Sequence, residues 1–149
     1  MHKSVSRWLF RFSTGWVTLA ALVIFVLFTA LVLPRQAASS DLETGDVGSP
    51  DTMFYYAPAD LYRFAEAYGP QGRQAYVRAR FTFDLVWPLV YGIFLATAIS
   101  WVYTRAFSAD GPWQRANLLP VLGVLFDYLE NAATSVVMLR YPDQTPVVD

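Results

Sequence analysis

Three long stretches of this sequence carry almost no charge, and they restrict the folds that the chain can adopt. Residues 12–34 contain no charged side chain, residues 81–104 contain only Asp84, and residues 117–139 contain two acidic residues. A helix needs about 20 mostly apolar residues to cross the hydrocarbon of a bilayer, so each stretch is long enough. Because the backbone must satisfy its own hydrogen bonds in lipid, the stretches predict helices. We therefore predict an all-α integral membrane helical bundle with three transmembrane spans.

The composition agrees with one membrane domain over residues 1–149. Hydrophobic residues make up 55% of the chain and charged residues only 15%, which is more apolar than an ordinary soluble domain. Cysteine is absent and the only histidine is His2, so disulfides, thiolate metal sites and histidine-ligated metals or haem within the membrane are excluded. We expect no metal and no cofactor.

The first apolar stretch has two interpretations. The basic segment HKSVSRWLFR before it and the small residues of RQAASS after it also fit a secretory signal peptide. The apolar run exceeds the roughly 7 to 15 residues of a signal-peptide core, so we favour an uncleaved membrane anchor.

The positions of Lys and Arg predict the orientation of the chain. With a cytoplasmic N-terminus, short inner segments carry Lys3, Arg7, Arg11, Arg105 and Arg115. The outer segments are longer and carry Arg35, Arg63, Arg73, Arg78, Arg80 and Arg140. Cytoplasmic loops are enriched in basic residues, and the density of positive charge favours this orientation in the inner (plasma) membrane of the cell. Residues 35–80 then form an external loop.

The external loop divides into two halves. The segment SSDLETGDVGSPD is acidic and rich in Gly and Ser, which indicates a mobile surface connection. Residues 57–68 follow a helical pattern that begins at Pro58 and ends at Gly69 and Pro70. One face of that pattern is apolar and consists of Leu61, Phe64, Ala65 and Tyr68. We expect one or two short external amphipathic helices, with residues 70–80 beginning a helix that runs into the second span.

The spans also carry polar groups that need partners. Asp127, Glu130 and Asn131 lie within one helical turn of the third span. An acidic side chain at the centre of a spanning helix costs roughly 2.5 to 3.5 kcal/mol on insertion scales. If spans two and three are antiparallel, Tyr91 lies at the level of Asp127 and Asp84 lies nearer the outer boundary. These five residues form our candidate functional polar cluster.

Two interpretations of this cluster remain open. Its carboxyls could bind a proton or a cation, or act as general acid and base on a lipid-borne substrate. Alternatively they hold helices together through hydrogen bonds, and Asp84 also complements a helix dipole. The expected counter-charges of Asp84 are Arg73, Arg78 and Arg80.

Small residues predict where the second and third spans touch. Asp84, Pro88, Gly92, Ala96 and Ser100 recur at every fourth position and form a ridge along one helix face. Such ridges let two helices approach closely. We expect this ridge to contact a stripe on the third span that contains Gly123, Asp127 and Asn131.

Three short motifs resemble those of a known group of proteins. They are G-x-x-GR from Gly69, D-x-x-x-P-x-x-YG from Asp84, and LP followed by FD-x-x-EN from Leu119. In this pattern the chain resembles small, uncharacterised bacterial multi-pass membrane proteins. The resemblance implies a multi-pass helical fold and no particular activity. It also implies a further span after Tyr141 and Pro142, so the chain is expected to be a shortened member or a fragment.

Two functional hypotheses follow. The favoured one is a non-catalytic helix-packing or accessory protein, because the sequence offers no pair of nucleophile and base. Its expected partners are the lipid bilayer and a second copy or a partner membrane subunit, without nucleic acid. The alternative is a membrane-embedded enzyme or an ion- or proton-coupled carrier. The two differ in whether the carboxyls converge on a water-accessible cavity or are each satisfied by a neighbouring donor.

Overall fold

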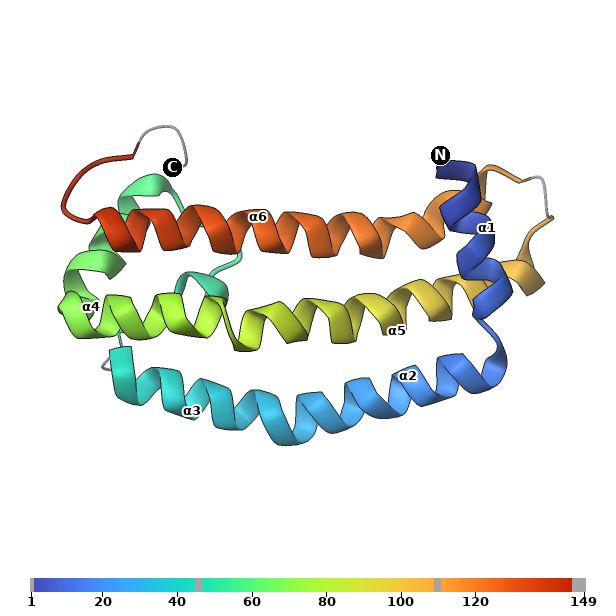
Figure 1. Ribbon diagram of the computed structural model, residues 1–149, viewed down its shortest axis with the longest axis horizontal. Helices are drawn as coiled ribbons and strands as arrows, with labels where there is room; N and C mark the ends of the chain where they lie inside the picture. The colour runs from blue at the N-terminus through green and yellow to red at the C-terminus, as the bar shows by residue number, and fades with distance from the viewer. Residues whose placement is uncertain (1, 45–46, 109–110, 146–149) are drawn as a thin grey trace. The chain divides into compact units, whose positions relative to one another are not determined.

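The computed structural model describes residues 2–44, 47–108 and 111–145, and its regular elements are all helical (Figure 1). The prediction of an all-α fold is confirmed. The α-helices are α1 (His2–Phe12), α2 (Gly15–Leu27), α3 (Leu33–Thr44), α4 (Pro58–Arg80), α5 (Phe83–Ala106) and α6 (Leu119–Arg140). A π-helix, η1 (Phe28–Val32), joins α2 to α3, and two 3₁₀ helices are η2 (Pro50–Thr52) and η3 (Pro112–Leu118).

Three helical segments of the described chain are long and apolar enough to cross a membrane. They are Gly15–Leu42, Pro58–Ala106 and Arg115–Arg140. Each contains one of the three predicted stretches, apart from the first residues of the first stretch, which precede Gly15. The protein is therefore a membrane protein with three candidate spans.

The chain folds into two compact units. Unit 1 consists of Met1–Leu31 and Val86–Asp127, and unit 2 consists of Val32–Leu85 and Tyr128–Asp149. Unit 1 therefore holds α1, α2, most of α5 and the first part of α6. Unit 2 holds α3, α4 and the second part of α6. Each unit is described by itself below.

The first candidate span starts later and extends further than predicted. Thr14 caps α2, because its hydroxyl oxygen accepts a hydrogen bond from the Val17 amide at 3.3 Å. The helix then continues through η1 into α3 and ends at Thr44, so the mobile connection predicted over residues 39–51 is wrong for residues 39–44. Residues 45–46 of that prediction lie outside the described part of the chain. The wider π turn just before Pro34 accommodates a residue that has no backbone N–H to donate. The sequence LPRQAASSDLET then supplies helix-forming Ala, Gln and Leu.

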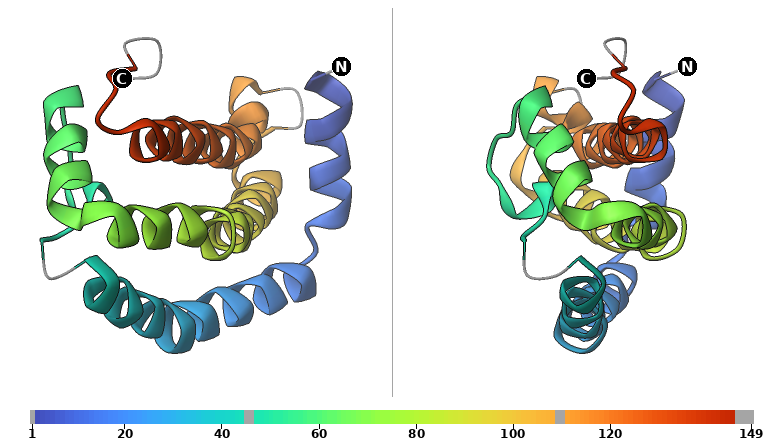
Figure 2. Two further views of the ribbon diagram at one scale, coloured as in Figure 1. Left: turned by 60° about the vertical axis from the view of Figure 1, so that its left-hand side comes forward. Right: turned by 90° about the vertical axis from the view of Figure 1, so that its left-hand side faces the viewer.

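The amphipathic helix predicted for residues 57–68 is confirmed in unit 2. Pro58 is the first residue of α4, and the Ala57 amide donates to the Asp60 carboxylate at 2.8 Å. Gly69 leaves the helical conformation with φ 62° and ψ 179°, which glycine adopts readily. The two segments of α4 on either side of Gly69 run in clearly different directions (Figure 2).

The second segment of α4 does not run unbroken into the second span. It ends at Arg80, and Phe81 and Thr82 form a turn before α5 begins at Phe83. The Thr82 hydroxyl donates to the carbonyl of Arg78 at 2.8 Å, which satisfies one of the last carbonyls of the helix. The expectation of one continuous helix through residues 70–104 is therefore wrong at this turn.

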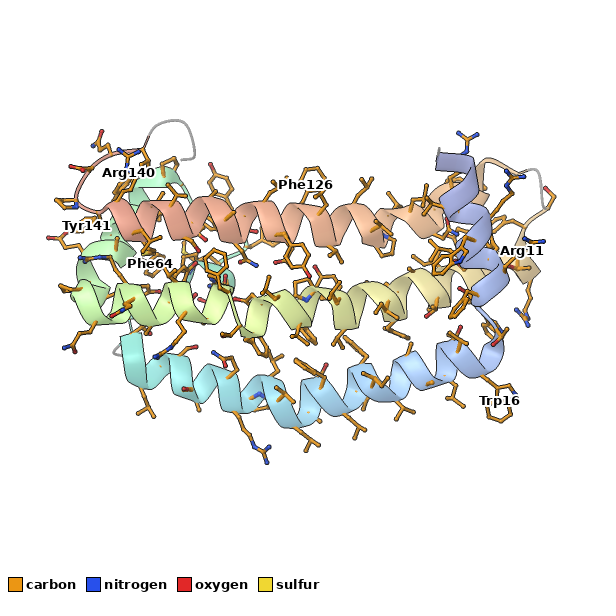
Figure 3. The ribbon with its side chains drawn as sticks, viewed as in Figure 1. Arg11, Trp16, Phe64, Phe126, Arg140 and Tyr141 are labelled. Atoms are coloured by element: carbon orange, nitrogen blue, oxygen red, sulfur yellow. The ribbon has the colours of Figure 1, made fainter. Side chains whose placement is uncertain are left out.

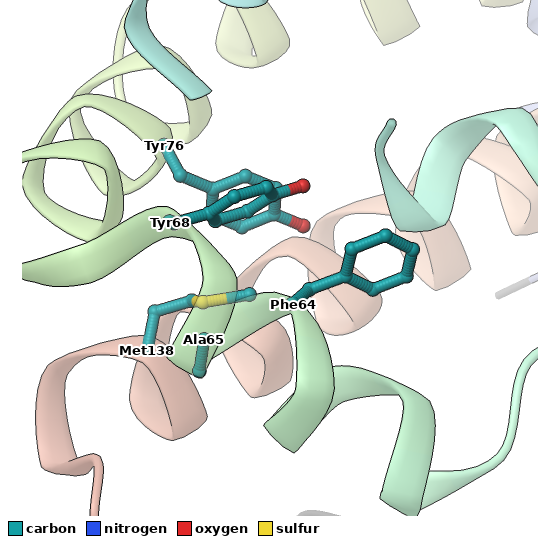
Figure 4. Packing of buried hydrophobic residues seen from close by; sticks show 5 residues of the cluster. All are labelled: Phe64, Ala65, Tyr68, Tyr76 and Met138. Carbon is teal, nitrogen blue, oxygen red and sulfur yellow. The ribbon is translucent and has the colours of Figure 1, made fainter. Parts of the chain in front are cut away.

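The hydrophobic core of unit 2 lies between the two segments of α4 and the end of α6. Its buried residues are Phe64, Ala65, Tyr68, Tyr76 and Met138 (Figure 4). The apolar face predicted for residues 57–68 is buried throughout. Each large apolar side chain contributes roughly 1.5 to 3 kcal/mol to stability where the alternative is water.

The helices of unit 1 meet through aromatic and small residues. Phe25 of α2 stacks on Trp87 and Phe94 of α5 at centroid distances of 5.8 and 5.0 Å. The small-residue face of α5 is buried at Pro88, Gly92, Ala96 and Ser100, as the ridge predicts. Large apolar side chains point outward elsewhere, for example Trp16 at 82% exposure and Phe126 at 66% (Figure 3).

Within unit 1, the contact between this ridge and α6 differs from the prediction at Gly123. A Cβ built on Gly92 would contact Val124 and the carbonyl of Pro120, whereas one built on Gly123 would meet nothing within 4 Å. Gly123 therefore does not take part in the close contact. The face of α6 that contacts α5 instead contains Pro120, Val124 and Asp127. Gly123 lies on the adjacent face of the helix.

Candidate functional site

The predicted polar cluster is divided between the two units. Tyr91 and Asp127 belong to unit 1, whereas Asp84, Glu130 and Asn131 belong to unit 2. Within its own unit, each of the three carboxylates accepts a hydrogen bond from a side chain of a different element.

In unit 1, Tyr91 and Asp127, which were expected to lie at the same depth, are hydrogen-bonded to each other. The Tyr91 hydroxyl on α5 donates to Oδ2 of Asp127 on α6 at 2.6 Å. Tyr91 packs edge-to-face against Trp87, with the two ring centroids 5.7 Å apart. The hydrogen bond joins α5 to α6 beside the close contact at Gly92. A hydrogen bond to a charged group contributes about 1.5 to 3 kcal/mol.

In unit 2, Glu130 binds a tyrosine that the sequence analysis did not identify. The Tyr56 hydroxyl, from the segment before α4, donates to Oε1 of Glu130 on α6 at 2.5 Å. Burial of the phenol, reinforced by this bond and by the charge of Glu130, raises the pKa of Tyr56 well above its ordinary value. Asn131 is half-buried, and its backbone carbonyl accepts a 3.3 Å hydrogen bond from the Thr134 hydroxyl.

Asp84 takes part in an ion-pair cluster around Arg80, one of the three predicted counter-charges. The Arg80 side chain is only 8% exposed, and its Nη1 donates to Oδ2 of Asp84 at 2.6 Å. Its Nη2 donates to Oδ2 of Asp51 in η2, a residue that the sequence analysis placed in a mobile connection. The guanidinium also lies over the ring of Tyr76, with Cζ 4.2 Å from the centroid. A buried charge is tolerated because it is paired in this way.

The other two predicted counter-charges are placed differently. Nη1 of Arg73 donates to the carbonyl of Ala65 at 2.7 Å, and its guanidinium lies 4.7 Å from the ring centroid of Tyr141. Arg73 thus links the two segments of α4 across the bend at Gly69 and packs against Tyr141, which follows α6. Arg78 is exposed on α4.

A cavity of about 260 Å³ adjoins the Arg80 cluster within unit 2. Helix α3 contributes one wall, the segment around η2 contributes a second, and α4 with the start of α5 contributes the third. Arg80, Asp51 and Asp84 all line it. The cavity was not predicted, because it depends on residues 39–44 being helical.

A further polar network in unit 1 was also missed. Asn117 is completely buried, accepts a hydrogen bond from the Ser6 hydroxyl at 2.8 Å, and donates to the Ser100 hydroxyl oxygen at 3.1 Å and to the Ser6 carbonyl at 3.2 Å. The network joins α1, α5 and η3. The sequence pattern marks Asn117 only as the first residue of a span and α1 only as a basic leader.

The contacts that the structure shows for these groups are hydrogen bonds and ion pairs. Among residues 2–44, 47–108 and 111–145, no three His, Cys, Asp or Glu side chains are grouped so that they could hold a metal ion. Comparison of the chain with protein-family models, with curated proteins and with solved structures gives no match.

Proposed function

We propose that this chain is a non-catalytic multi-pass membrane protein whose intramembrane polar groups fix the packing of its helices. The observation that supports the proposal is that three acidic side chains each have their own donor. Asp84 accepts from Arg80, Asp127 from Tyr91 and Glu130 from Tyr56. A carboxylate held in this way joins two elements and gains its stabilisation from a fixed donor.

Each of the three donors also lies on a different element from the carboxylate that it binds. Tyr56 brings the segment before α4 onto α6, and Tyr91 joins α5 to α6. Arg80 connects η2 to the start of α5. Each polar pair therefore specifies which elements are neighbours within its unit, which is the role expected of polar groups in a helical membrane protein.

The proposed setting is the inner membrane of a bacterium, with the N-terminus in the cytoplasm. The proposed partners are lipid and either a second copy or another membrane subunit, which would cover part of the exposed apolar surface. On α2 alone, that surface includes Leu19, Leu22, Val23, Ile24, Val26 and Leu27. A helix that exposes this many apolar side chains needs lipid or a protein partner around it.

The packing role can be tested with amide substitutions. Asp127→Asn and Glu130→Gln keep an acceptor oxygen for Tyr91 and Tyr56 but remove the ionisable group. If the carboxyls serve packing, both variants should unfold close to the wild-type temperature and should retain the cellular phenotype that is lost on deletion of the protein. Asp127→Leu, which removes the acceptor, should lower stability by about 1 to 3 kcal/mol.

The opposite pattern would support the membrane-embedded enzyme or carrier. In that case the amide variants would fold normally and lose the phenotype completely.

Cross-linking or mass measurement of the protein in nanodiscs tests the proposed assembly. A chain that is monomeric and without a co-purifying subunit would contradict it.

The proposed orientation can be tested by labelling single cysteines. The natural chain has no cysteine, so each introduced thiol is the only one. Tyr55 is 78% exposed in the predicted external loop, and Ser108 is exposed on the predicted cytoplasmic side. Tyr55→Cys should react with an impermeant maleimide added to intact cells, and Ser108→Cys should react only after permeabilisation. The reverse result would show a cytoplasmic loop.

A further inference from the structure

The cavity in unit 2 has a polar end and an apolar end. On α3 its lining begins with Leu33 and ends with Ser40, Asp41 and Thr44. Phe83, at the start of α5, also lines it. Since a helix rises 1.5 Å per residue, Leu33 and Asp41 lie about 12 Å apart along α3. Leu33 lies within the first candidate span and Asp41 is next to its final residue, so the polar end is at the end of the span.

The charged residues that line the cavity favour a cation. They are Asp41, Asp51 and Asp84, opposed by Arg80 alone, so the lining carries a formal charge of minus two. Because Arg80 already binds Asp51 and Asp84, Asp41 adds negative charge beyond that pairing. Ser40 and Thr44, which flank Asp41 on α3, and Ser49 add hydroxyl oxygens to the lining. These are acceptors for the N–H groups of a primary ammonium.

Arg80 provides a second and independent indication of a ligand. Its side chain is 8% exposed and lines the cavity, but its Nε–H is buried without a hydrogen-bond partner. A buried donor without an acceptor costs about 1 to 3 kcal/mol, so an oxygen supplied from the cavity would be favourable. The Nε atom is shielded from water. A phosphate oxygen suits this donor best, because it is anionic.

We propose that this cavity binds the headgroup of a phospholipid in which the phosphate is esterified to an alcohol that bears a primary ammonium. The ammonium lies at Asp41 and Asp51, and the phosphate lies at Arg80. The acyl chains leave past Leu33 and Phe83 into the bilayer. The cavity is smaller than the roughly 300 to 1,000 Å³ that encloses a drug-sized ligand, so it holds a headgroup and not a whole lipid. The binding site is additional to the packing role proposed above.

The geometry favours a primary over a quaternary ammonium. Quaternary ammonium groups are recognised by open aromatic faces. One face of Tyr76 lies against the Arg80 guanidinium, and the Tyr68 hydroxyl already donates to the Gly48 carbonyl at 2.7 Å. The carboxylates and hydroxyls at the polar end instead require N–H donors, which a primary ammonium has and a quaternary one lacks.

Native mass spectrometry of the full chain in detergent can test the proposal. Phosphatidylethanolamine, phosphatidylcholine and phosphatidylglycerol with identical acyl chains would be titrated separately. The apparent affinity for phosphatidylethanolamine should exceed that for the other two by about tenfold or more, as expected for a charge-assisted hydrogen bond. Asp41→Asn should remove most of this preference. Equal retention of the three lipids would overturn the proposal.

Two controls test whether the lipid preference arises at this cavity. Asp143→Asn removes an exposed carboxylate of unit 2 that does not line the cavity, and it should leave the preference unchanged. Asp41 is itself exposed, so Asp41→Asn should fold, and an unfolding scan verifies this. Water-soluble phosphoethanolamine should compete only weakly. If it binds as tightly as the lipid, the ligand is a free phosphorylated amine and the assignment to a lipid is wrong.

Discussion

A Cβ atom placed on Gly92 would lie 2.4 Å from Cγ2 of Val124. Gly92 is buried on α5 and Val124 lies on α6, so the two helices of unit 1 are in direct contact at this pair. The backbone conformation of Gly92 is helical, and the requirement for glycine is therefore one of space. This is the use of small residues that membrane helices commonly make.

Replacing Gly92 by Ala should destabilise the protein. The added methyl group must displace Val124, whose branched side chain has few rotamers in a helix. Overpacking of this kind costs about 1 to 3 kcal/mol, and Gly92→Leu should cost more. Thermal unfolding in detergent, followed by circular dichroism, measures the loss.

Gly123 provides the matched control for this prediction. It lies next to Val124 on α6, but an added Cβ there would meet nothing within 4 Å. Gly123→Ala should therefore be neutral or slightly stabilising, because Ala is the better helix former. Adding Val124→Ala to Gly92→Ala should recover part of the loss. Equal stability of Gly92→Ala and Gly123→Ala would contradict the contact.

Replacing Asn117 by Leu should release α1 from unit 1. The substitution removes the partner of the Ser6 hydroxyl and of the Ser100 hydroxyl oxygen, both of which are buried. Leaving buried polar groups without partners costs about 1 to 3 kcal/mol each. Hydrogen exchange in residues 5–12 should rise strongly, while exchange in α6 should change little. An exposed control is Ser108→Ala, for which exchange in α1 should remain at the wild-type level.

The contrast between the amphipathic helix and the Asn117 network shows what could be predicted from the sequence. The helix over residues 57–68 depends on Pro58, Gly69 and an apolar face, all of which lie within one short segment. The Ser6–Asn117 bond joins residues 111 positions apart, and the Tyr56–Glu130 bond joins residues 74 positions apart. No periodicity or cap encodes such pairs, because they depend on how the helices pack.

The Tyr91–Asp127 pair lies between these two cases. Antiparallel helices of known rise predict that the two residues lie at one level, but depth alone does not predict the hydrogen bond between them. The same reasoning failed for Gly123, since depth does not determine which face of α6 turns toward α5. The sequence predicts only part of the Arg80 cluster. The Arg80–Asp84 pair could be predicted because the two residues are four positions apart, whereas Asp51 comes from a segment without any pattern.

Replacing Arg80 by Gln should be among the most damaging single substitutions in unit 2. It removes the charge that Asp51 and Asp84 share. Asp51 is 51% exposed, so most of the loss comes from the pair with Asp84, which is 13% exposed, and loss of one partner from a buried ion pair costs roughly 3 to 5 kcal/mol. Arg80→Lys should recover only part of this, because an ammonium lacks the fork that reaches both carboxylates. Stability can be measured by unfolding in detergent and urea.

Arg78, two residues earlier and exposed, supplies the control. Arg78→Gln should change stability by no more than about 0.5 kcal/mol. The triple variant with Asp51→Asn and Asp84→Asn in the Arg80→Gln background should be more stable than Arg80→Gln alone. If Arg80→Gln and Arg78→Gln had equal effects, the Arg80 ion pairs would not stabilise unit 2.

The alkaline limb of the stability profile should depend on Tyr56. Burial, together with the hydrogen bond to Glu130, raises the pKa of this phenol in the folded protein above its ordinary value near 10. Below pH 10 the phenol is protonated in both the folded and the unfolded chain, so its contribution to stability is present in full. Above pH 10 the unfolded chain loses the proton first and binds fewer protons than the folded chain. Stability must then fall as the pH rises.

Unfolding in detergent between pH 7 and pH 11 should resolve this contribution by comparison of three proteins. Tyr56→Phe should be less stable than the wild type at neutral pH, because Glu130 loses a donor, by about 1 to 3 kcal/mol. The difference should shrink above pH 10, since the variant has no phenol to ionise at this position. Tyr55→Phe, at the adjacent residue with 78% exposure, should follow the wild type at every pH. A constant difference between the wild type and Tyr56→Phe up to pH 11 would show that the Tyr56 phenol is not held in its protonated form by burial and Glu130.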